Sequence, residues 1–142
     1  MKRLLALLLL PALGGCTVVG ASATWSSTAC PAGMQAAQRA ELYMGLGRKG
    51  GGEVSPADVD AFVAATLTPA FPDGLTLLRG QGQWRAADGR IARESSLLAV
   101  VILPGATGEQ ARDRLTPVAE AWRARFAQES VLKAIGPACV AF

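Results

Sequence analysis

The chain contains no histidine. Serine–histidine–aspartate and cysteine–histidine mechanisms both need an imidazole that accepts and returns a proton, so neither can operate here. Imidazole is also the commonest metal ligand, and three cysteines with other expected roles cannot complete a zinc or iron–sulfur ligand set. We therefore expect no metal site and no cofactor.

A surplus of charge is also missing. Lys and Arg number 14 against 11 Asp and Glu, and two of the basic residues, Lys2 and Arg3, belong to a leader. The rest of the chain has 12 basic residues against 11 acidic ones, which is too even a balance for a nucleic-acid-binding surface. We expect no nucleic-acid partner.

The first residues have the pattern of a secretory signal. Lys2 and Arg3 precede an apolar run over residues 4–13, which at about ten residues is too short for a bilayer that needs roughly 20 in a helix. The segment Leu13-Gly14-Gly15-Cys16 then resembles a bacterial lipobox. This resemblance implies cleavage before Cys16, a thioether-linked diacylglyceryl group and N-acylation (palmitate). The alternative is an ordinary signal peptide with an incidental cysteine.

The expected product is an envelope lipoprotein whose membrane partner is reached through Cys16. Several acyl chains anchor a protein stably, whereas one chain binds only marginally. Thr17 is not the aspartate that resembles an inner-membrane retention signal, so the periplasmic face of the outer membrane is favoured. Residues 1–15 are then a signal peptide, 16–38 a lipidated tether rich in Ala, Ser, Thr and Gly, and 39–142 one domain.

Cys30 and Cys139 are the other two cysteines. In an oxidising periplasm an isolated pair favours a disulfide, here closing a loop of about 110 residues and contributing roughly 4–5 kcal/mol in the chain-entropy model. Two buried free thiols are the alternative. Redox catalysis is not expected, because no C-x-x-C pair is present.

The first half of the domain predicts a strand and a helix. Side chains alternate over residues 40–46, which is typical of a strand with one buried face. Ser55 is a preferred N-cap, and a proline at position 56 suits the start of a helix. We expect Pro69 to end this helix.

The second half predicts two strands, a helix and a last strand. The Asp88-Gly89 pair joins strands over 75–84 and 91–103 as a hairpin, and Pro104 stops the second of them. Pro117 lies inside the following helix and should kink it or make its first turn irregular. The apolar stripe of that helix consists of Leu115, Val118, Trp122 and Phe126. Pro137 interrupts the last strand over 131–142, which suits an edge position or a bulge.

This order predicts an α+β, ferredoxin-like βαββαβ fold with a four-stranded antiparallel sheet and two helices on one face. The fourth strand then lies beside the first, where Cys139 can reach Cys30. Residues 97–103 are apolar on both faces, so the face without helices must also be covered. Either a second copy covers it, as in dimeric α+β barrels, or residues 17–38 fold back over it.

Several segments together resemble a bacterial family known only as domain of unknown function 3574. The segments that carry the resemblance are Glu41–Gly45, Phe71–Thr76, Gly80–Arg85, Arg93–Ser95 and Cys139–Phe142. The resemblance covers residues 40–142. Met44 departs from the pattern, where an aromatic residue is expected, and so does Ala70, where arginine is usual. The family implies no activity, so the chemistry must be sought in the residues.

Residues 45–50 spell G-x-G-x-x-G between the first strand and the first helix. A dinucleotide site requires the helix to open at the glycines, and here it begins about five residues later. A flexible loop is the ordinary interpretation. The alternative is an anion or lipid-headgroup site formed by Arg48, Lys49 and the helix start near Ser55.

A second cluster of polar and aromatic residues falls on the predicted hairpin. Its members are Arg79, Gln83, Trp84, Arg85, Arg93 and Glu94. Pairing across the hairpin is expected to bring Gln83 or Arg85 near Arg93 and Glu94. A tryptophan with arginines suits an acidic or sugar-like ligand, with Glu94 as general acid or base. The alternative is a structural ion pair with the tryptophan packed on the sheet edge.

Three functions remain open. The leading one is a non-enzymatic, ligand- or protein-binding module, with a small-molecule or protein partner and a possible homodimer. The second is a small enzyme of the dimeric α+β barrel type that uses Glu94, Tyr43 and an arginine such as Arg93. Tyr43 shares a face with Glu41, where it lines a pocket or packs at an interface. The third is anion or lipid-headgroup binding by the Gly-rich loop.

Overall fold

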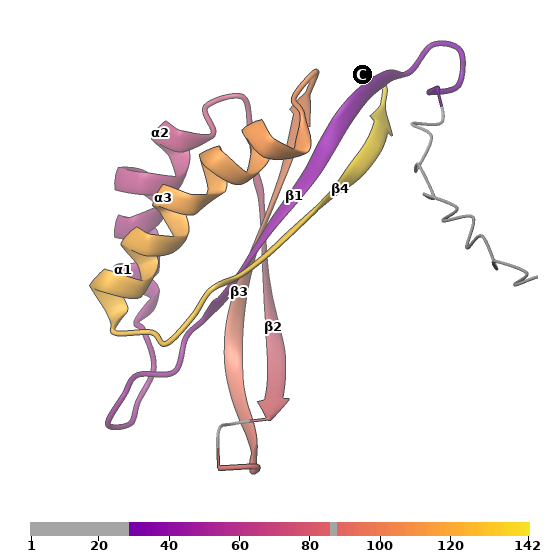
Figure 1. The fold of residues 1–142 in the computed structure, drawn as a ribbon. Helices are drawn as coiled ribbons and strands as arrows, with labels where there is room; N and C mark the ends of the chain where they lie inside the picture. The colour runs from indigo at the N-terminus through magenta and orange to yellow at the C-terminus, as the bar shows by residue number, and fades with distance from the viewer. Residues whose placement is uncertain (1–28, 86–87) are drawn as a thin grey trace, which may run out of the picture.

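Four antiparallel strands form a sheet, and the helical segments cover one of its faces (Figure 1). The computed structural model describes residues 29–142 apart from 86 and 87. The strands are β1 (Gln35–Gly45), β2 (Thr76–Arg85), β3 (Ile91–Pro104) and β4 (Leu132–Val140), in the spatial order β2-β3-β1-β4. The predicted ferredoxin-like arrangement is confirmed.

The first helical segment passes through Pro69 instead of ending there. It consists of α1 (Pro56–Phe62), a π-helical turn η1 (Val63–Leu67) and a last turn α2 (Thr68–Ala70). In the wider π turn the Thr68 N–H donates to the Val63 carbonyl, five residues back. Pro69 therefore enters at the start of a new α turn, where a missing N–H costs little. The predicted end at Pro69 was wrong for this reason.

Helix α3 (Gly108–Phe126) begins in a capping box. The Thr107 side chain accepts a hydrogen bond from the Gln110 N–H, and the Gln110 side chain accepts one from the Thr107 N–H at 2.8 Å. The helix runs without a break past Pro117 and ends at Ala127, which has a left-handed conformation (φ 54°). Pro117 lies far beyond the first turn, so the alternative of an irregular first turn was wrong.

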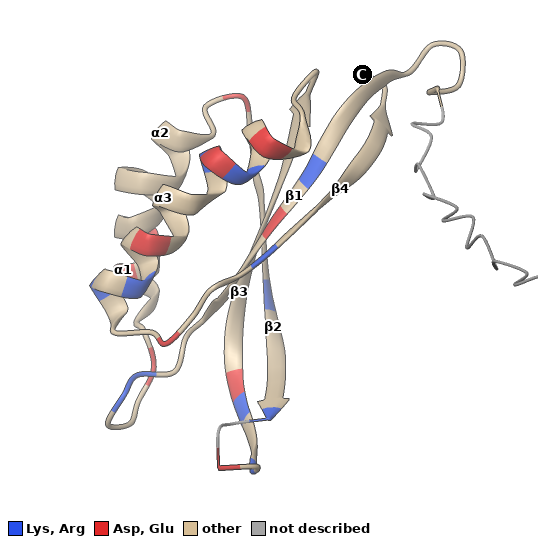
Figure 2. Ribbon diagram, in the orientation of Figure 1, with Lys and Arg blue, Asp and Glu red and all other residues tan. Residues whose placement is uncertain are grey.

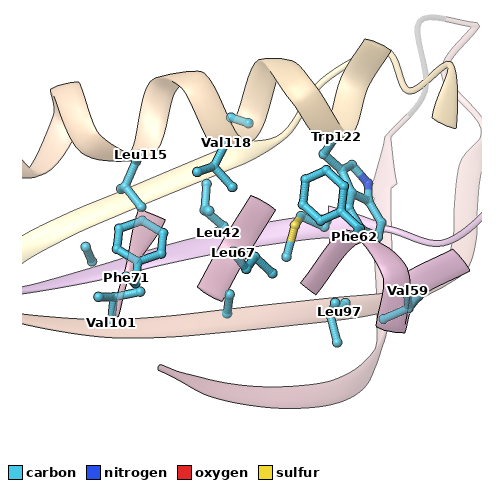
Figure 3. Packing of buried hydrophobic residues seen from close by; sticks show 14 of the residues in the cluster. Leu42, Val59, Phe62, Leu67, Phe71, Leu97, Val101, Leu115, Val118 and Trp122 are labelled. Carbon is cyan, nitrogen blue, oxygen red and sulfur yellow. The ribbon is translucent and has the colours of Figure 1, made fainter. Parts of the chain in front are cut away.

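The core lies between the helices and the sheet. Figure 3 shows aromatic side chains of the two helical segments meeting over β1 and β3. Phe62 and Trp122 pack edge to face with their ring centroids 4.9 Å apart, and the Trp122 indole N–H donates to the Gly45 carbonyl at 3.2 Å. The central strands contribute Ala40, Leu42 and Met44 of β1 and Leu97, Ala99, Val101 and Leu103 of β3 to this core.

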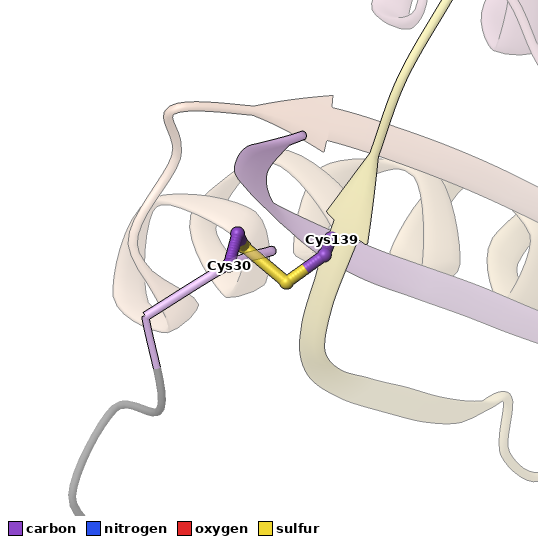
Figure 4. Close-up of a disulfide and its surroundings, with 2 residues drawn as sticks. All are labelled: Cys30 and Cys139. Carbon is purple, nitrogen blue, oxygen red and sulfur yellow. A yellow bond between two sulfur atoms is a disulfide. The ribbon is translucent and has the colours of Figure 1, made fainter. Parts of the chain in front are cut away.

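A disulfide joins Cys30 to Cys139 at the start of the described chain, as predicted (Figure 4). Strand β1 also begins earlier than the predicted 40–46, because its first residues pair with β4 as far as Gln35 opposite Val140. Strand β4 is an unbroken edge strand that includes Pro137, as its position at the edge allows. No helix in the described part of the chain is long and apolar enough to span a bilayer.

Candidate functional site

One face of the sheet is left uncovered by the helices. The strand registers place Leu132, Tyr43, Leu98 and Leu78 side by side across β4, β1, β3 and β2. Because paired residues share a face, these four side chains form one apolar row across the whole sheet. We call the face without helices the open face, and these four side chains the apolar row. Residues 97–103 are apolar on both faces of the sheet, as expected. Their side chains are buried on the helix-covered face and half-buried on the open face.

On the side of the apolar row towards the β2–β3 turn, the open face has few side chains. Gly45 and Gly80 both pair with Ser96, and Gly82 pairs with Glu94 one step further along β3. The only long side chain that rises from this part of β3 is Glu94. The glycines and Ser96 therefore leave the carboxyl of Glu94 accessible beside a large apolar row.

Two glycines and a glutamine hold Glu94 in place. The Gly47 N–H donates to Oε2 of Glu94 at 3.2 Å, and the side-chain amide of Gln128 donates to the Gly47 carbonyl. A Cβ atom on Gly45 would lie 2.5 Å from Oε1 of Glu94 and 2.9 Å from Oε1 of Gln128. A Cβ atom on Gly47 would lie 2.8 Å from Oε2 of Glu94. Only glycine leaves room for the carboxyl at both positions.

The surroundings of Glu94 keep its carboxyl less acidic than an exposed one. Burial raises the pKa of Glu94, and the negative charge of Glu53 adds to the increase, while the hydrogen bond from Gly47 opposes it. Among the described residues Glu94 takes part in no ion pair. This carboxyl can therefore accept hydrogen bonds from a ligand or exchange a proton with one.

Tyr43 lies on the same face but its hydroxyl is bound elsewhere. The Tyr43 hydroxyl donates to Oε2 of Glu41 at 2.6 Å, and the Arg39 Nε–H donates to Oε1 at 2.6 Å. These two hydrogen bonds lower the pKa of Glu41, and the first raises the pKa of Tyr43. Tyr43 therefore stays a neutral phenol that borders the site with its ring.

The residues of the predicted hairpin cluster divide between the two faces of the sheet. Trp84 and Glu94 lie on the open face, whereas Gln83 and Arg93 pair on the opposite face, where the Arg93 Nε–H donates to Gln83 Oε1 at 3.4 Å. The expected proximity of Gln83 and Arg93 is confirmed. The expected proximity of Gln83 or Arg85 to Glu94 was wrong, because consecutive side chains on a strand point to opposite faces. The alternative, a structural ion pair within the cluster, was also wrong, since none of these described residues forms one.

The two remaining arginines of the cluster lie on the helix-facing side. Arg85 donates to the Gly89 carbonyl at 3.3 Å. Arg79 lines a hollow of about 240 Å³ together with Glu53 and Leu46. A larger hollow of about 490 Å³ lies near Pro104 at the far end of β3, but the side chains of Gln110 and Arg114 that line it already bond to the protein. Neither hollow includes Glu94.

The Gly-rich loop is closed by its own contacts. Gly47 and Glu53 form an isolated bridge, and glycines 50–52 turn the chain with positive φ angles. Arg48 makes an ion pair with Asp58 at 2.6 Å and donates to the Glu53 carbonyl at 3.2 Å. This arginine ties the loop to the first turn of α1, so less of its charge is available to an anion, and Lys49 lies beside it.

The sequence pattern did not place glycines 45 and 47, Ser96 or Gln128 around Glu94. The signal present was the pair of glycines at alternating positions where β1 ends, but they were interpreted as part of the G-x-G-x-x-G loop. Across the described residues, no group of three or more cysteine or acidic side chains is arranged to hold a metal ion.

Known proteins resemble this chain in family and in fold. Two structures of a phage SAM lyase are similar, one in complex with S-methyl-5'-thioadenosine (TM-score 0.57, 17% identity, 82% of this chain and 95% of that one) and one in the apo state (TM-score 0.54, 19% identity, 82% and 97%). CutA from Synechococcus elongatus matches with a TM-score of 0.45 and 9% identity over 79% of this chain and 86% of that one.

At these identities the phage enzyme shows a shared fold and nothing more. No curated protein is significantly similar in sequence. The model of the family described as "Protein of unknown function (DUF3574)" matches residues 39–142, which is more than half of the chain. The chain therefore belongs to this family of unknown function.

Proposed function

We propose that the domain binds a small ligand on its open face, with Glu94 as the group that fixes the polar end of that ligand. The observation that carries the proposal is the position of the Glu94 carboxyl, which is held over two glycines on an apolar face and takes part in no ion pair among the described residues. Ligand sites in proteins combine a mainly apolar surface with a few placed polar groups. The apolar row and Glu94 have this composition.

The fold neighbour supplies the chemical class to test first. A phage SAM lyase of this fold is known in complex with S-methyl-5'-thioadenosine. A nucleoside thioether has an aromatic base and an apolar sulfur chain that can lie beside the apolar row, over Gly80, Gly82 and Ser96, together with hydroxyl and amino donors for Glu94. We therefore propose S-methyl-5'-thioadenosine and S-adenosylmethionine as probes.

Binding is measured by calorimetry on three proteins: wild type, Gly45→Ala and Gly108→Ala. The added methyl group on Gly45 displaces the Glu94 carboxyl, whereas a Cβ on Gly108, at the start of α3 and away from the open face, meets nothing within 4 Å. Hydrogen bonds to a charged group contribute about 1.5–3 kcal/mol, so Gly45→Ala should weaken binding by roughly ten-fold to a hundred-fold. Gly108→Ala should bind as wild type. Equal affinities in all three proteins, or no binding of either probe, would reject the proposal.

A second candidate function is a small enzyme that uses Glu94 as general acid or base. The raised pKa of Glu94 favours it, since a proton-transfer group works best when its pKa lies near the working pH. Arg93 is on the opposite face, so the arginine of this site would have to be Arg39 acting through Glu41. Formation of S-methyl-5'-thioadenosine from S-adenosylmethionine, lost in Glu94→Gln, would support the enzyme. Absence of turnover in a protein that binds the nucleoside favours the binding module.

We also propose that the domain works at the cell envelope, anchored by lipid on Cys16. Residues 1–28 lie outside the described part of the chain, so the signal peptide, the lipidation site and most of the tether remain predictions. The disulfide supports export, since such bonds persist in oxidising compartments.

A further inference from the structure

We infer that a second copy of this chain covers the open face and closes the Glu94 site. The apolar row is too exposed for a finished surface, since Leu132 is 62% and Leu78 51% exposed and Trp84 beside the site is 47% exposed. On the next positions along β3, Val100 and Ile102 are only half-buried. Contiguous apolar patches of this kind mark interaction sites.

The charges of the open face also fit an interface. Only three charged side chains, those of Arg39, Glu41 and Glu94, belong to the four strands on this face, and the first two form an ion pair at 2.6 Å. Figure 2 shows that charges gather instead on the helical layer, on the loop after β1 and at the end of the β2–β3 hairpin. Depletion of charge is the feature that distinguishes the centre of an interface from the remaining surface.

The size of the open face is what a stable dimer needs. Four strands about 4.8 Å apart, with the shortest having nine residues that each rise about 3.3 Å, give an outline of roughly 600 Å². Accessible area exceeds this outline because side chains stand up from the sheet. A standard interface takes about 800 Å² from each partner. The open face of one copy therefore matches that of another in area.

After the proposed cleavage before Cys16, the segment that precedes the disulfide is too small to cover this face. Thirteen residues separate Cys16 from Cys30, and their large apolar side chains are Val18, Val19 and Trp25. An extended segment covers the width of one strand, about 4.8 Å, whereas the apolar row crosses four. A second copy presents the same row on the same area, as a two-fold interface requires.

Glycines on the open face allow a second sheet to approach. Gly80, Gly82 and Gly136 project no side chain from the outer strands. Packed sheets lie about 10 Å apart, and at that distance the opposing copy would roof the space above Glu94. The interface goes beyond the proposed ligand binding and stands without it, because the apolar row alone carries it.

The test measures the protein mass of the purified full-length chain in detergent by light scattering, for wild type, Leu78→Lys and Ile91→Lys. Leu78 and Ile91 are equally exposed, at 51%, but Ile91 lies on the opposite face of the same hairpin. We expect at least two chains per particle for wild type and Ile91→Lys, and one for Leu78→Lys. Leu132→Lys, on β4, is a second variant with the same expected loss.

Hydroxyl-radical labelling of Leu98 in the same samples separates the remaining cases. Slow labelling in wild type and several-fold faster labelling in Leu78→Lys support the interface. A wild-type monomer with slow labelling would mean that the N-terminal segment covers the face, and a monomer with fast labelling would mean that the face is bare. Either result overturns the inference. Dissociation by Ile91→Lys as well as by Leu78→Lys also overturns it, as does association that both Leu78→Lys and Leu132→Lys leave unchanged. The nucleoside affinities are measured separately, so the two proposals fail independently.

Discussion

At the scale of single residues, the Glu94 carboxyl occupies space that a methyl group on Gly45 or Gly47 would need. The site thus depends on missing side chains as much as on the acid itself. Partial burial makes ionisation of Glu94 less favourable in the folded protein than in the unfolded chain. A group held at such a cost to stability is typical of a functional site rather than of a structural one.

Replacing Glu94 with glutamine should therefore stabilise the protein above acidic pH. Because the folded pKa is raised, the two proteins are equal in this respect below the unfolded pKa, where Glu94 is protonated in both states. As the pH rises from the unfolded pKa through the folded one, wild type loses stability that Glu94→Gln keeps. We therefore expect Glu94→Gln to melt at a higher temperature than wild type at neutral pH.

Melting temperatures of the two proteins between pH 3 and 8 test this expectation. The other carboxyl groups titrate in both proteins, so the difference between the two curves isolates Glu94. A melting temperature of Glu94→Gln that falls below that of wild type as the pH rises would mean that the folded state favours the charged form of Glu94, contrary to the burial argument.

At the scale of elements, local pattern predicted what local interactions determine. The strands followed from alternation, and α1 followed from Ser55 and Pro56, whose roles at the start of the helix the structure confirms. The first residues of β1 were missed because Ala36, Ala37 and Gln38 show no apolar alternation, and pairing with β4 decides their conformation. The Glu94 site was missed for the same reason. It depends on a register between β1 and β3, which one sequence does not reveal.

The start of α3 offers a local test of element stability. The Thr107 hydroxyl accepts the Gln110 N–H, so Thr107→Ala should cost about 1 kcal/mol and lower the melting temperature by roughly 4 °C. Thr107→Ser keeps the hydroxyl and should stay close to wild type. Equal losses in both variants, measured by thermal denaturation, would show that the methyl group of Thr107 and not its capping oxygen matters.

At the scale of the whole molecule, one covalent link ties the start of the described chain to its last strand. Cys30 and Cys139 are 109 residues apart in sequence, and their Cα atoms are 5.5 Å apart. Closing so long a loop restricts the unfolded chain strongly, by about 4–5 kcal/mol in the entropic model. Domains of this size are stable by only about 5–15 kcal/mol, so the link is a large part of the total.

Removing the link with Cys30→Ser and Cys139→Ser together should lower the denaturant midpoint markedly. Wild type treated with reductant should match the double variant, because both lose the same cross-link. The measurement is guanidinium unfolding with and without reductant. A midpoint that reductant leaves unchanged in wild type would show that the two cysteines are not bonded in the purified protein.

The proposed place of the molecule at the cell envelope depends on Cys16, and the replacement of Cys16 gives the most direct test. Without a thiol at position 16 no thioether to lipid forms, so Cys16→Ser should leave the membrane fraction and appear as soluble or unprocessed protein. The double variant Cys30→Ser, Cys139→Ser is the control, since it also replaces cysteines by serine but should stay with the membrane. Lipid attachment also predicts that wild type partitions into detergent phase and Cys16→Ser does not, because several acyl chains anchor stably. Membrane association that persists in Cys16→Ser would instead assign the anchoring to the protein surface, where the apolar open face becomes the first candidate.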